Sequence, residues 1–108
     1  MIWKPNVTVA AVVQRDGKFL LVEEETENGQ AFNQPAGHLE EGESLVDAVV
    51  REALEETAYQ FKPTHLVGIY NWKHPTKALT YMRFAFGGEL RGWEADRRLD
   101  EGIIAARW

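Results

Sequence analysis

The sequence predicts an α+β domain in which several short strands accompany a single amphipathic helix. The chain has 108 residues, a length that suits one domain spanning residues 1–108. Its hydrophobic content of 44% and aromatic content of 11% are typical of a globular protein, not of a disordered one. Several β-branched or aromatic runs alternate with turn signals, whereas only one segment has helical periodicity. A chain of this size buries roughly 65% of its unfolded surface, enough for one core.

The charge and the residue types exclude several classes of protein. A net charge of −5 argues against a general binder of nucleic-acid polymers or membrane surfaces. The negative net charge does not exclude phosphate substrates, because bound divalent metals can invert the sign of the local electrostatic field. The absence of cysteine excludes a disulfide framework and a zinc–thiolate site. The sequence has no signal peptide and no apolar run of the roughly 18 residues that a membrane span needs, so we expect a cytoplasmic protein. We expect it to be a monomer or a homodimer.

The first part of the chain predicts a hairpin followed by loops. Val7 to Val13 is a β-branched, apolar run that predicts a buried strand. Asp16-Gly17 predicts a tight turn, with Phe19 to Val22 as the returning strand. The segment Glu23 to Gln30 is acidic and polar and carries a second turn signal at Asn28-Gly29, and Phe32 to Leu39 is predicted to be a loop.

A helix is predicted from Leu45 to about Ala58. Ser44 followed three residues later by Asp47 resembles a capping box. The expected core face consists of Val46, Val49, Val50 and Ala53. At 100° per residue, three glutamates fall within an arc of about 100° beside that apolar stripe, namely Glu52, Glu55 and Glu56.

The second part of the chain predicts three further strands. Leu66 to Trp72 and Leu79 to Phe86 are the first two, joined by a loop over 74–77, and Gly87 and Gly88 are expected to end the second. Alternation puts Met82, Phe84 and Phe86 on one face and Tyr81, Arg83 and Ala85 on the other. After a charged loop over 91–102, Ile103 to Trp108 predicts a final strand. A strand with no polar tail after it suggests a C-terminally truncated domain.

The three glutamates of the helix predict a cation site. At positions i, i+3 and i+4 they share one face, where like charges repel by roughly 0.2–0.5 kcal/mol per pair. A cation would offset that repulsion, and hard oxygen ligands suit Mg²⁺, with Mn²⁺ as a substitute. An acidic helix face by itself is, however, more often simply solvated.

The longer spacing around the helix is more specific. Six residues form the pattern G-x5-E-x7-R-E-A-L-E-E, namely Gly37, Glu43, Arg51, Glu52, Glu55 and Glu56. This pattern resembles the Nudix box, with one departure: the family's second glycine is Ala58 here. A glycine at that position would serve a left-handed helix cap, so the departure puts the helix end in question and not the metal ligands. The resemblance implies an α/β/α sandwich around a mixed sheet, here lacking the C-terminal helix.

The resemblance extends over nearly the whole chain. The segments KPNVTVAAVV, GKFLLVEEE, FNQPAGHLE and MRFAF are similar to the NudJ subgroup of bacterial phosphatases within this family, whose members usually continue for another helix. This similarity implies metal-dependent hydrolysis of nucleoside tri- and diphosphates. It also implies two other substrates, the pyrophosphate of the hydroxymethylpyrimidine precursor of thiamine and thiamine pyrophosphate itself.

The resemblance also implies roles for individual residues. The metal ligands would be Glu52, Glu55 and Glu56 with the backbone carbonyl of Ala36, and Glu43 would join through water. Glu52 is in addition a candidate base, and Arg51 would orient the carboxylates through a charge-assisted pair. Glu101, in the loop before the last strand, is either a further ligand or base or a solvated loop acid. The expected catalytic set is therefore Arg51, Glu52 and Glu56.

Four further residues are candidates for substrate binding. Arg83 lies among apolar strand residues, where it would meet either a phosphate or a structural ion-pair partner. Trp72 and Phe32 would stack on a substrate ring or pack in the core. Lys77 would contact phosphate or be solvated. His38, His65 and His74 have no ligand-like spacing, and we expect no metal binding by His65 or His74.

Two other classes of function stay open from the sequence. One is a non-catalytic Nudix-type domain that binds a nucleotide or a partner protein, against which the intact box argues. The other is an acidic interaction helix on an unrelated α+β domain, which requires the box to be a coincidence. A metal titration separates this last alternative from the other two.

Overall fold

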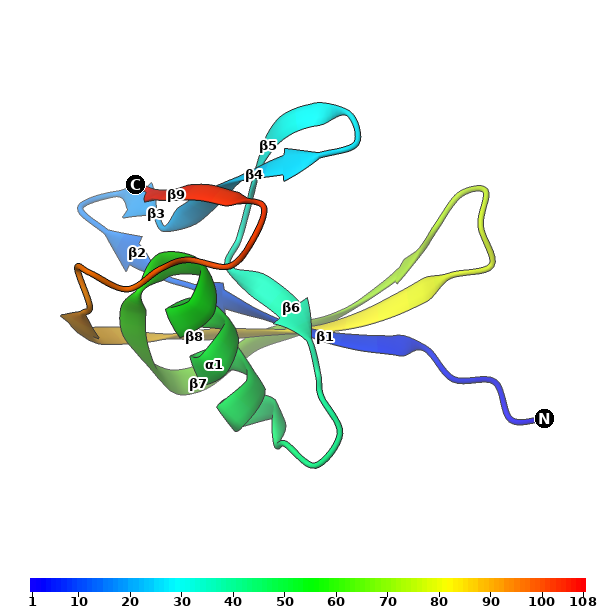
Figure 1. Cartoon of the computed structure of the whole chain (residues 1–108). Helices are drawn as coiled ribbons and strands as arrows, with labels where there is room; N and C mark the ends of the chain where they lie inside the picture. Colours follow the sequence, from blue (N-terminus) through cyan, green and yellow to red (C-terminus); the bar gives the residue numbers. More distant parts are fainter.

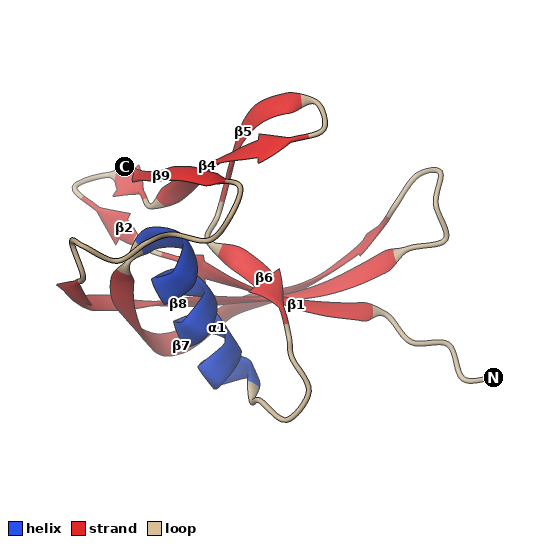
Figure 2. Cartoon of the chain, viewed as in Figure 1, coloured by secondary structure: helices blue, strands red, loops and turns tan.

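A computed structural model describes residues 1–108 and contains one helix and three β-sheets (Figures 1 and 2). The helix α1 lies against one side of the central sheet, and a smaller sheet lies beyond its C-terminal end (Figure 2). The elements are β1 (Asn6–Val12), β2 (Gln14–Arg15), β3 (Lys18–Phe19), β4 (Leu21–Thr26), β5 (Gly29–Asn33), β6 (Ala36–His38), α1 (Leu45–Thr57), β7 (Tyr59–Lys73), β8 (Thr80–Trp93) and β9 (Ile103–Arg107). This is the α+β architecture with a mixed sheet that the sequence predicts, and no helix follows β9 within these residues.

The central sheet has the strand order β6-β1-β8-β7. β1 pairs in parallel with β8, whereas the β1–β6 and β7–β8 pairs are antiparallel. The predicted strand over Val7 to Val13 is confirmed, and its register places Val9 opposite Phe84. Val9 and Ala11 belong to the buried cluster that also contains Val49 and Ala53 of α1. The core therefore lies between α1 and the central sheet, and it fixes the acidic edge of the helix beside β6.

The helix begins and ends where the sequence predicts. The Ser44 hydroxyl accepts a hydrogen bond of 3.0 Å from the Asp47 N–H, which caps the first turn. Ala58 adopts the left-handed conformation with φ 63° and donates its N–H to the Leu54 carbonyl at 2.9 Å. An alanine there costs about 1 kcal/mol relative to glycine, so the absent family glycine changes stability and not the position of the helix end.

The prediction that Val46 belongs to the core face of the helix is wrong. Val46 is 48% exposed, whereas Val49 and Ala53 are buried together with Ala48. The neighbouring residue Leu45 packs against the core instead, so the buried face includes Leu45, Ala48, Val49, Glu52 and Ala53 and leaves Val46 at its edge. The predicted core face is therefore rotated relative to the observed one.

The predicted loop over Phe32 to Leu39 instead contains the end of β5 and all of β6, and the acidic segment Glu23 to Gln30 lies in β4, the turn and β5. β4 and β5 form a hairpin whose tip is the predicted Asn28-Gly29 turn, with φ 98° at Gly29. β9 pairs with the other edge of β4, and Arg107 donates hydrogen bonds of 3.1 and 3.2 Å to Glu23. Cross-strand pairing thus stabilises an acidic strand that its own composition does not favour.

The two strands of the long hairpin also extend further than predicted. β7 starts at Tyr59 and β8 continues to Trp93, so Gly87 and Gly88 lie inside a strand instead of ending it. A Cβ atom on Gly88 would lie 2.1 Å from the Lys62 carbonyl oxygen. The glycine therefore permits close approach of β7 at a bulge, a role that the sequence cannot distinguish from strand termination. The one helix of the fold is too short and too polar to cross a membrane.

Candidate functional site

Arg51 is the centre of an ion-pair network at the acidic edge of α1. Its guanidinium donates to Glu43 through two nitrogens, at 2.7 and 3.0 Å. It also donates to Glu52 at 2.7 Å and to Glu55 at 2.8 Å. A further hydrogen bond of 3.0 Å reaches the His38 carbonyl oxygen, which ties the helix to β6. The pairing of Arg51 with Glu52 that the sequence predicts is present, within a larger network.

This network offsets much of the repulsion among the acids. Hydrogen bonds from Arg51, followed by one from the Glu40 N–H, lower the pKa of Glu43 to about 2. The same carboxylates raise the pKa of Arg51 above its ordinary value, with Glu43 as the largest cause. An arginine thus supplies part of the positive charge that the helix spacing calls for. The case for a metal cation must therefore rest on the acids that Arg51 does not reach.

Glu56 is the principal acid of that kind. It accepts a hydrogen bond of 2.9 Å from the Ala36 N–H but forms no ion pair. Burial raises its pKa to about 7; the Ala36 N–H opposes this shift, and the charges of Glu52, Glu24 and Asp100 add to it. Burial likewise raises the pKa of Glu52 despite its bond to Arg51. Glu56 is a half-buried carboxyl beside other acids, an arrangement that a cation would stabilise.

Gly37 has a specific steric role beside these acids. A Cβ atom built on Gly37 would lie 2.0 Å from the carboxyl carbon of Glu52. Any larger residue here would have to displace that carboxylate, which Arg51 holds by a hydrogen bond. The same close approach sets the Ala36 backbone beside Glu56, where we expect the Ala36 carbonyl to act as a ligand.

The loop before β9 brings a further acid, Asp100, to the site. Its N–H donates a hydrogen bond of 2.9 Å to the Glu55 carbonyl oxygen, so the loop crosses the end of the helix. Burial and then the charge of Glu55 raise the pKa of Asp100. The sequence prediction selected the next residue, Glu101; both residues are exposed, and it is Asp100 that bonds to the Glu55 carbonyl. The spacing of residues in the sequence cannot tell which of two adjacent acids in a charged loop lies near the helix. The path of the backbone decides it.

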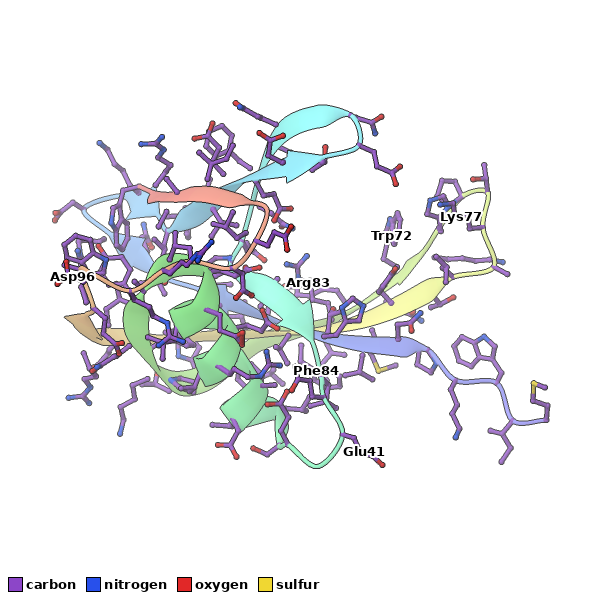
Figure 3. All side chains as sticks on the ribbon, in the orientation of Figure 1. Glu41, Trp72, Lys77, Arg83, Phe84 and Asp96 are labelled. Carbon is purple, nitrogen blue, oxygen red and sulfur yellow. The ribbon has the colours of Figure 1, made fainter.

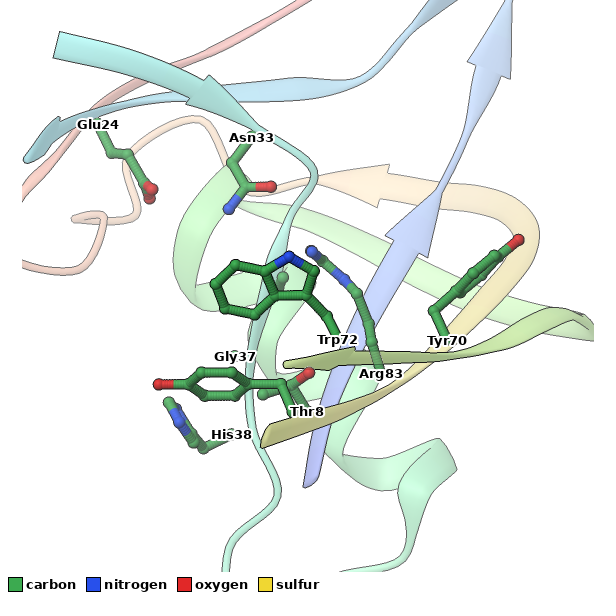
Figure 4. Close-up of a pocket in the computed structure, with 10 residues that line it drawn as sticks. Thr8, Glu24, Asn33, Gly37, His38, Tyr70, Trp72 and Arg83 are labelled. Carbon is green, nitrogen blue, oxygen red and sulfur yellow. The ribbon is translucent and has the colours of Figure 1, made fainter. Parts of the chain in front are cut away.

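A cavity of about 630 Å³ opens next to the acids, a volume typical of small-molecule sites (Figure 4). Arg83 lies in it with its Nε and Nη2 atoms buried and without any hydrogen-bond partner. Burial lowers the pKa of Arg83, and the charge of Glu56 opposes this shift. The residues that line the cavity are Thr8, Glu24, Asn33, Ala36, Gly37, His38, Tyr70, Trp72, Tyr81 and Arg83.

Only two of the four predicted substrate residues line the cavity, Arg83 and Trp72 (Figure 4). Phe32 is 62% exposed and lies outside it, because it alternates along β5 with Asn33, which does line it. Lys77 lies in the loop at the tip of the β7–β8 hairpin, where its N–H donates to the His74 ring (Figure 3). The aromatic character of Phe32 and the charge of Lys77 suggested a role, but strand alternation and hairpin length place both elsewhere.

The donor set at this site suits Mg²⁺ or Mn²⁺ in chemical type, since it consists of carboxylates and a backbone carbonyl. No three of these side chains converge on one point here, because Glu43, Glu52 and Glu55 point to Arg51. The unpaired Glu56, with Glu24 and Asp100 near enough to raise its pKa, leaves negative charge that Arg51 does not offset. A divalent cation at Glu56 fits this electrostatic situation.

Nearly the whole chain is similar to known proteins. The model of the NUDIX domain family matches residues 3–108. The phosphatase NudJ of Escherichia coli strain K12 is 46% identical over 108 residues, which cover 99% of this chain and 69% of that relative.

Solved structures give the same result. A NUDIX hydrolase from Nitrosomonas europaea superimposes with a TM-score of 0.92 at 52% identity, over 97% of this chain and 72% of that one. A MutT NUDIX hydrolase from Burkholderia pseudomallei has a TM-score of 0.84 at 20% identity, over 98% of this chain and 83% of that one. The second likeness supports the fold alone.

Proposed function

The chain belongs to the Nudix family of hydrolases, enzymes that act on pyrophosphate bonds, and from this premise we propose its metal requirement and its substrates. The activity requires a divalent metal. It is directed at nucleoside tri- or diphosphates or related small pyrophosphates. The pyrophosphates of hydroxymethylpyrimidine and of thiamine belong to the same proposed substrate class. A bound Mg²⁺ would neutralise the phosphate oxygens and lower the pKa of a bound water.

The observation that carries this proposal is that Glu56 and Arg83, two half-buried groups of opposite charge, are near each other and both lack an ion-pair partner. Glu56 is a half-buried acid without an ion pair, and Arg83 is a half-buried base with two unpaired nitrogens in the neighbouring cavity. Their charges attract each other, but no salt bridge joins them. A metal ion at the acid and a phosphate at the base would satisfy both groups at once.

The residues of the box then take distinct roles. Glu52, Glu55 and Glu56 with the Ala36 carbonyl would hold the metal, and Glu43 would act through water. Glu52 would accept a proton from the attacking water, a task for which its raised pKa is favourable. Arg51 would hold Glu52 and Glu55 in place through the hydrogen bonds described above.

The further acid from the loop before β9 is either Glu101 or its neighbour. Burial and then the charge of Glu55 raise the pKa of Asp100, and its N–H donates to the Glu55 carbonyl, so we favour Asp100 over Glu101 as the additional ligand or base. Comparison of Asp100→Asn with Glu101→Gln decides between them. We expect the first substitution to lower kcat more than the second.

The test is a release assay for phosphate and pyrophosphate over nucleotides and thiamine precursors, with and without Mg²⁺. We expect turnover that excess EDTA abolishes and that Glu56→Gln lowers by about a hundredfold or more, while thermal melting shows an intact fold. Glu41→Gln is the matched control, because Glu41 is an exposed acid in the loop before the helix. Full turnover in EDTA would refute the metal requirement. Nucleotide binding without turnover would favour the non-catalytic alternative.

A further inference from the structure

The loop that joins β7 to β8 is closed by a histidine side chain. The loop projects from the body of the molecule (Figure 1), and its ends are joined by a hydrogen bond of 2.8 Å from the His74 N–H to the Leu79 carbonyl oxygen. Within the loop, Nδ1 of the His74 ring accepts hydrogen bonds from the N–H groups of Thr76, at 3.1 Å, and of Lys77, at 3.0 Å. One ring nitrogen therefore holds two backbone donors of the loop.

This arrangement has the form of a helix N-cap. At a helix start, the capping side chain accepts from the second or third residue after it, and proline is favoured directly after the cap. Here Pro75 follows His74, and the two donors come next. Asparagine, aspartate, serine and threonine usually take this role through an oxygen atom. A histidine differs from them because its acceptor nitrogen is lost when the ring takes up a proton.

The two donors determine which form of the His74 ring suits the closed loop. Nδ1 accepts a hydrogen bond only when it carries no hydrogen, so the neutral ring must carry its hydrogen on Nε2. Protonation places a hydrogen on Nδ1 that points toward the N–H groups of Thr76 and Lys77. Two attractive contacts then become repulsive, and the closed loop is disfavoured.

No acid is placed to hold the protonated form of this ring. The hydrogen bonds and the ring contact of His74 include no carboxylate. Lys73 and Lys77 are its charged neighbours in the hairpin, and neither forms a salt bridge. The ionisable side chains beside the loop line the cavity, namely Glu24, His38, Tyr70, Tyr81 and Arg83. The loop therefore supplies two like charges and no acid to a protonated ring.

The closed loop also supports one wall of the cavity. The His74 ring lies against the Trp72 ring, with centroids 5.5 Å apart and the planes inclined by 73°. Trp72 is half-exposed, and it lines the cavity. Movement of the His74 ring away from its two donors therefore removes a contact that holds Trp72.

From these contacts we propose that the β7–β8 loop is a pH-sensitive latch beside the cavity: the neutral His74 ring holds residues 74–79 closed, and its protonation releases the loop and its contact with Trp72. The closed state is present at higher pH and is lost as the pH falls through the range in which imidazole side chains gain a proton, around about 6.5. The inference concerns the order of the loop and does not depend on the reaction that the site catalyses.

NMR of the isotopically labelled chain between about pH 8 and about pH 5 tests the latch. At the upper end, the ring nitrogen signals of His74 should show the hydrogen on Nε2. As the ring gains its proton, the amide groups of Thr76 and Lys77 should lose protection from solvent exchange, measured relative to an unfolded peptide at the same pH, by about tenfold.

Three variants locate this transition. His74→Asn keeps an acceptor at the capping position but takes up no proton, so the loop should stay closed over the whole range. His74→Ala removes the acceptor, so the loop should be open throughout. His65→Asn is the matched control, because the Nδ1 atom of His65 pairs with the Thr64 hydroxyl at 2.9 Å and with no backbone donor; it should leave the transition unchanged.

Each outcome bears on the latch. A neutral His74 ring with its hydrogen on Nδ1 would overturn it. So would amide signals of Thr76 and Lys77 that follow the same pH course in His74→Asn as in the wild type, or a transition that only His65→Asn removes. The measurement uses no substrate, so loss of the proposed function leaves the latch standing, and an absent latch leaves the proposed function standing.

Discussion

Arg51 and Arg83 lie on either side of the same group of acids, and their surroundings are opposite. Arg51 donates to three carboxylates and one carbonyl, so its hydrogen-bonding capacity is largely used within the protein. Arg83 is half-buried and leaves Nε and Nη2 without a partner. We infer that Arg51 holds the acids of the site in place, whereas the two unpaired nitrogens of Arg83 are available to a ligand.

The two environments also differ in energy. A saturated arginine contributes to stability through charge-assisted hydrogen bonds. A buried donor left unsatisfied costs about 1–3 kcal/mol, which a protein tolerates mainly where binding will later satisfy the group. Substitution of the two arginines should therefore separate activity from stability in opposite ways.

The largest expected effect is on the activity of Arg83→Met. We expect kcat/KM to fall about a hundredfold for every phosphate substrate, since the variant loses a charge aimed at the phosphate. The melting temperature should stay unchanged or rise, because the substitution removes the unsatisfied buried nitrogens and keeps an apolar side chain. Steady-state kinetics and thermal melts test both parts. A melting temperature lower by several degrees would mean that Arg83 has a structural partner.

For Arg51→Ala we expect a clear loss of stability and a smaller loss of activity than for Arg83→Met. We expect the free energy of unfolding to fall by about 2 kcal/mol, because three carboxylates lose their shared cation. Activity should fall about tenfold, through misplacement of Glu52 and Glu55. Urea denaturation and kinetics measure the two effects. The matched control is Arg91→Ala, whose salt bridge to Glu89 is exposed and should contribute little; an equal loss there would contradict a special role for Arg51.

The smallest expected effect is a pH dependence of stability that originates at Glu56. Its pKa is raised from 4.5 to about 7, so the folded state holds this proton more tightly than the unfolded state does. In metal-free protein the contribution of Glu56 should therefore fall as the pH rises from about 4.5 to about 7 and level off above that. Because the group is only partly buried, the change should be on the order of 1 kcal/mol.

Glu56→Gln isolates this effect from those of the other acids. Urea denaturation in EDTA across the same pH window should show the difference between wild type and variant grow as the pH rises. Glu43 titrates in a separate, more acidic window, since its pKa is lowered to about 2. Parallel curves for the wild type and the variant would show that Glu56 is not the titrating group.

Local interactions explain what could be predicted from the sequence. The Ser44 cap, the helix from Leu45 and the Asp16-Gly17 turn all depend on contacts within a few residues, and all are present. The box is of the same kind, because its acids and arginine lie on one helix or directly before it. Spacing along the chain therefore determines which charged groups meet at this edge of the fold.

Contacts between distant segments decided the rest. β4 and β6 are strands because β9 and β1, which are distant in the sequence, pair with them, whereas β5 pairs with β4 across a local turn. The choice of Asp100 over Glu101 near the box depends on where a loop crosses α1. The cavity has the same origin, since Arg83, Trp72 and Asn33 come from three strands of two sheets. Sequence spacing determined the acids that we propose as catalytic because they share one helix, and tertiary structure decided the cavity that we propose for the substrate because no local interaction brings its walls together.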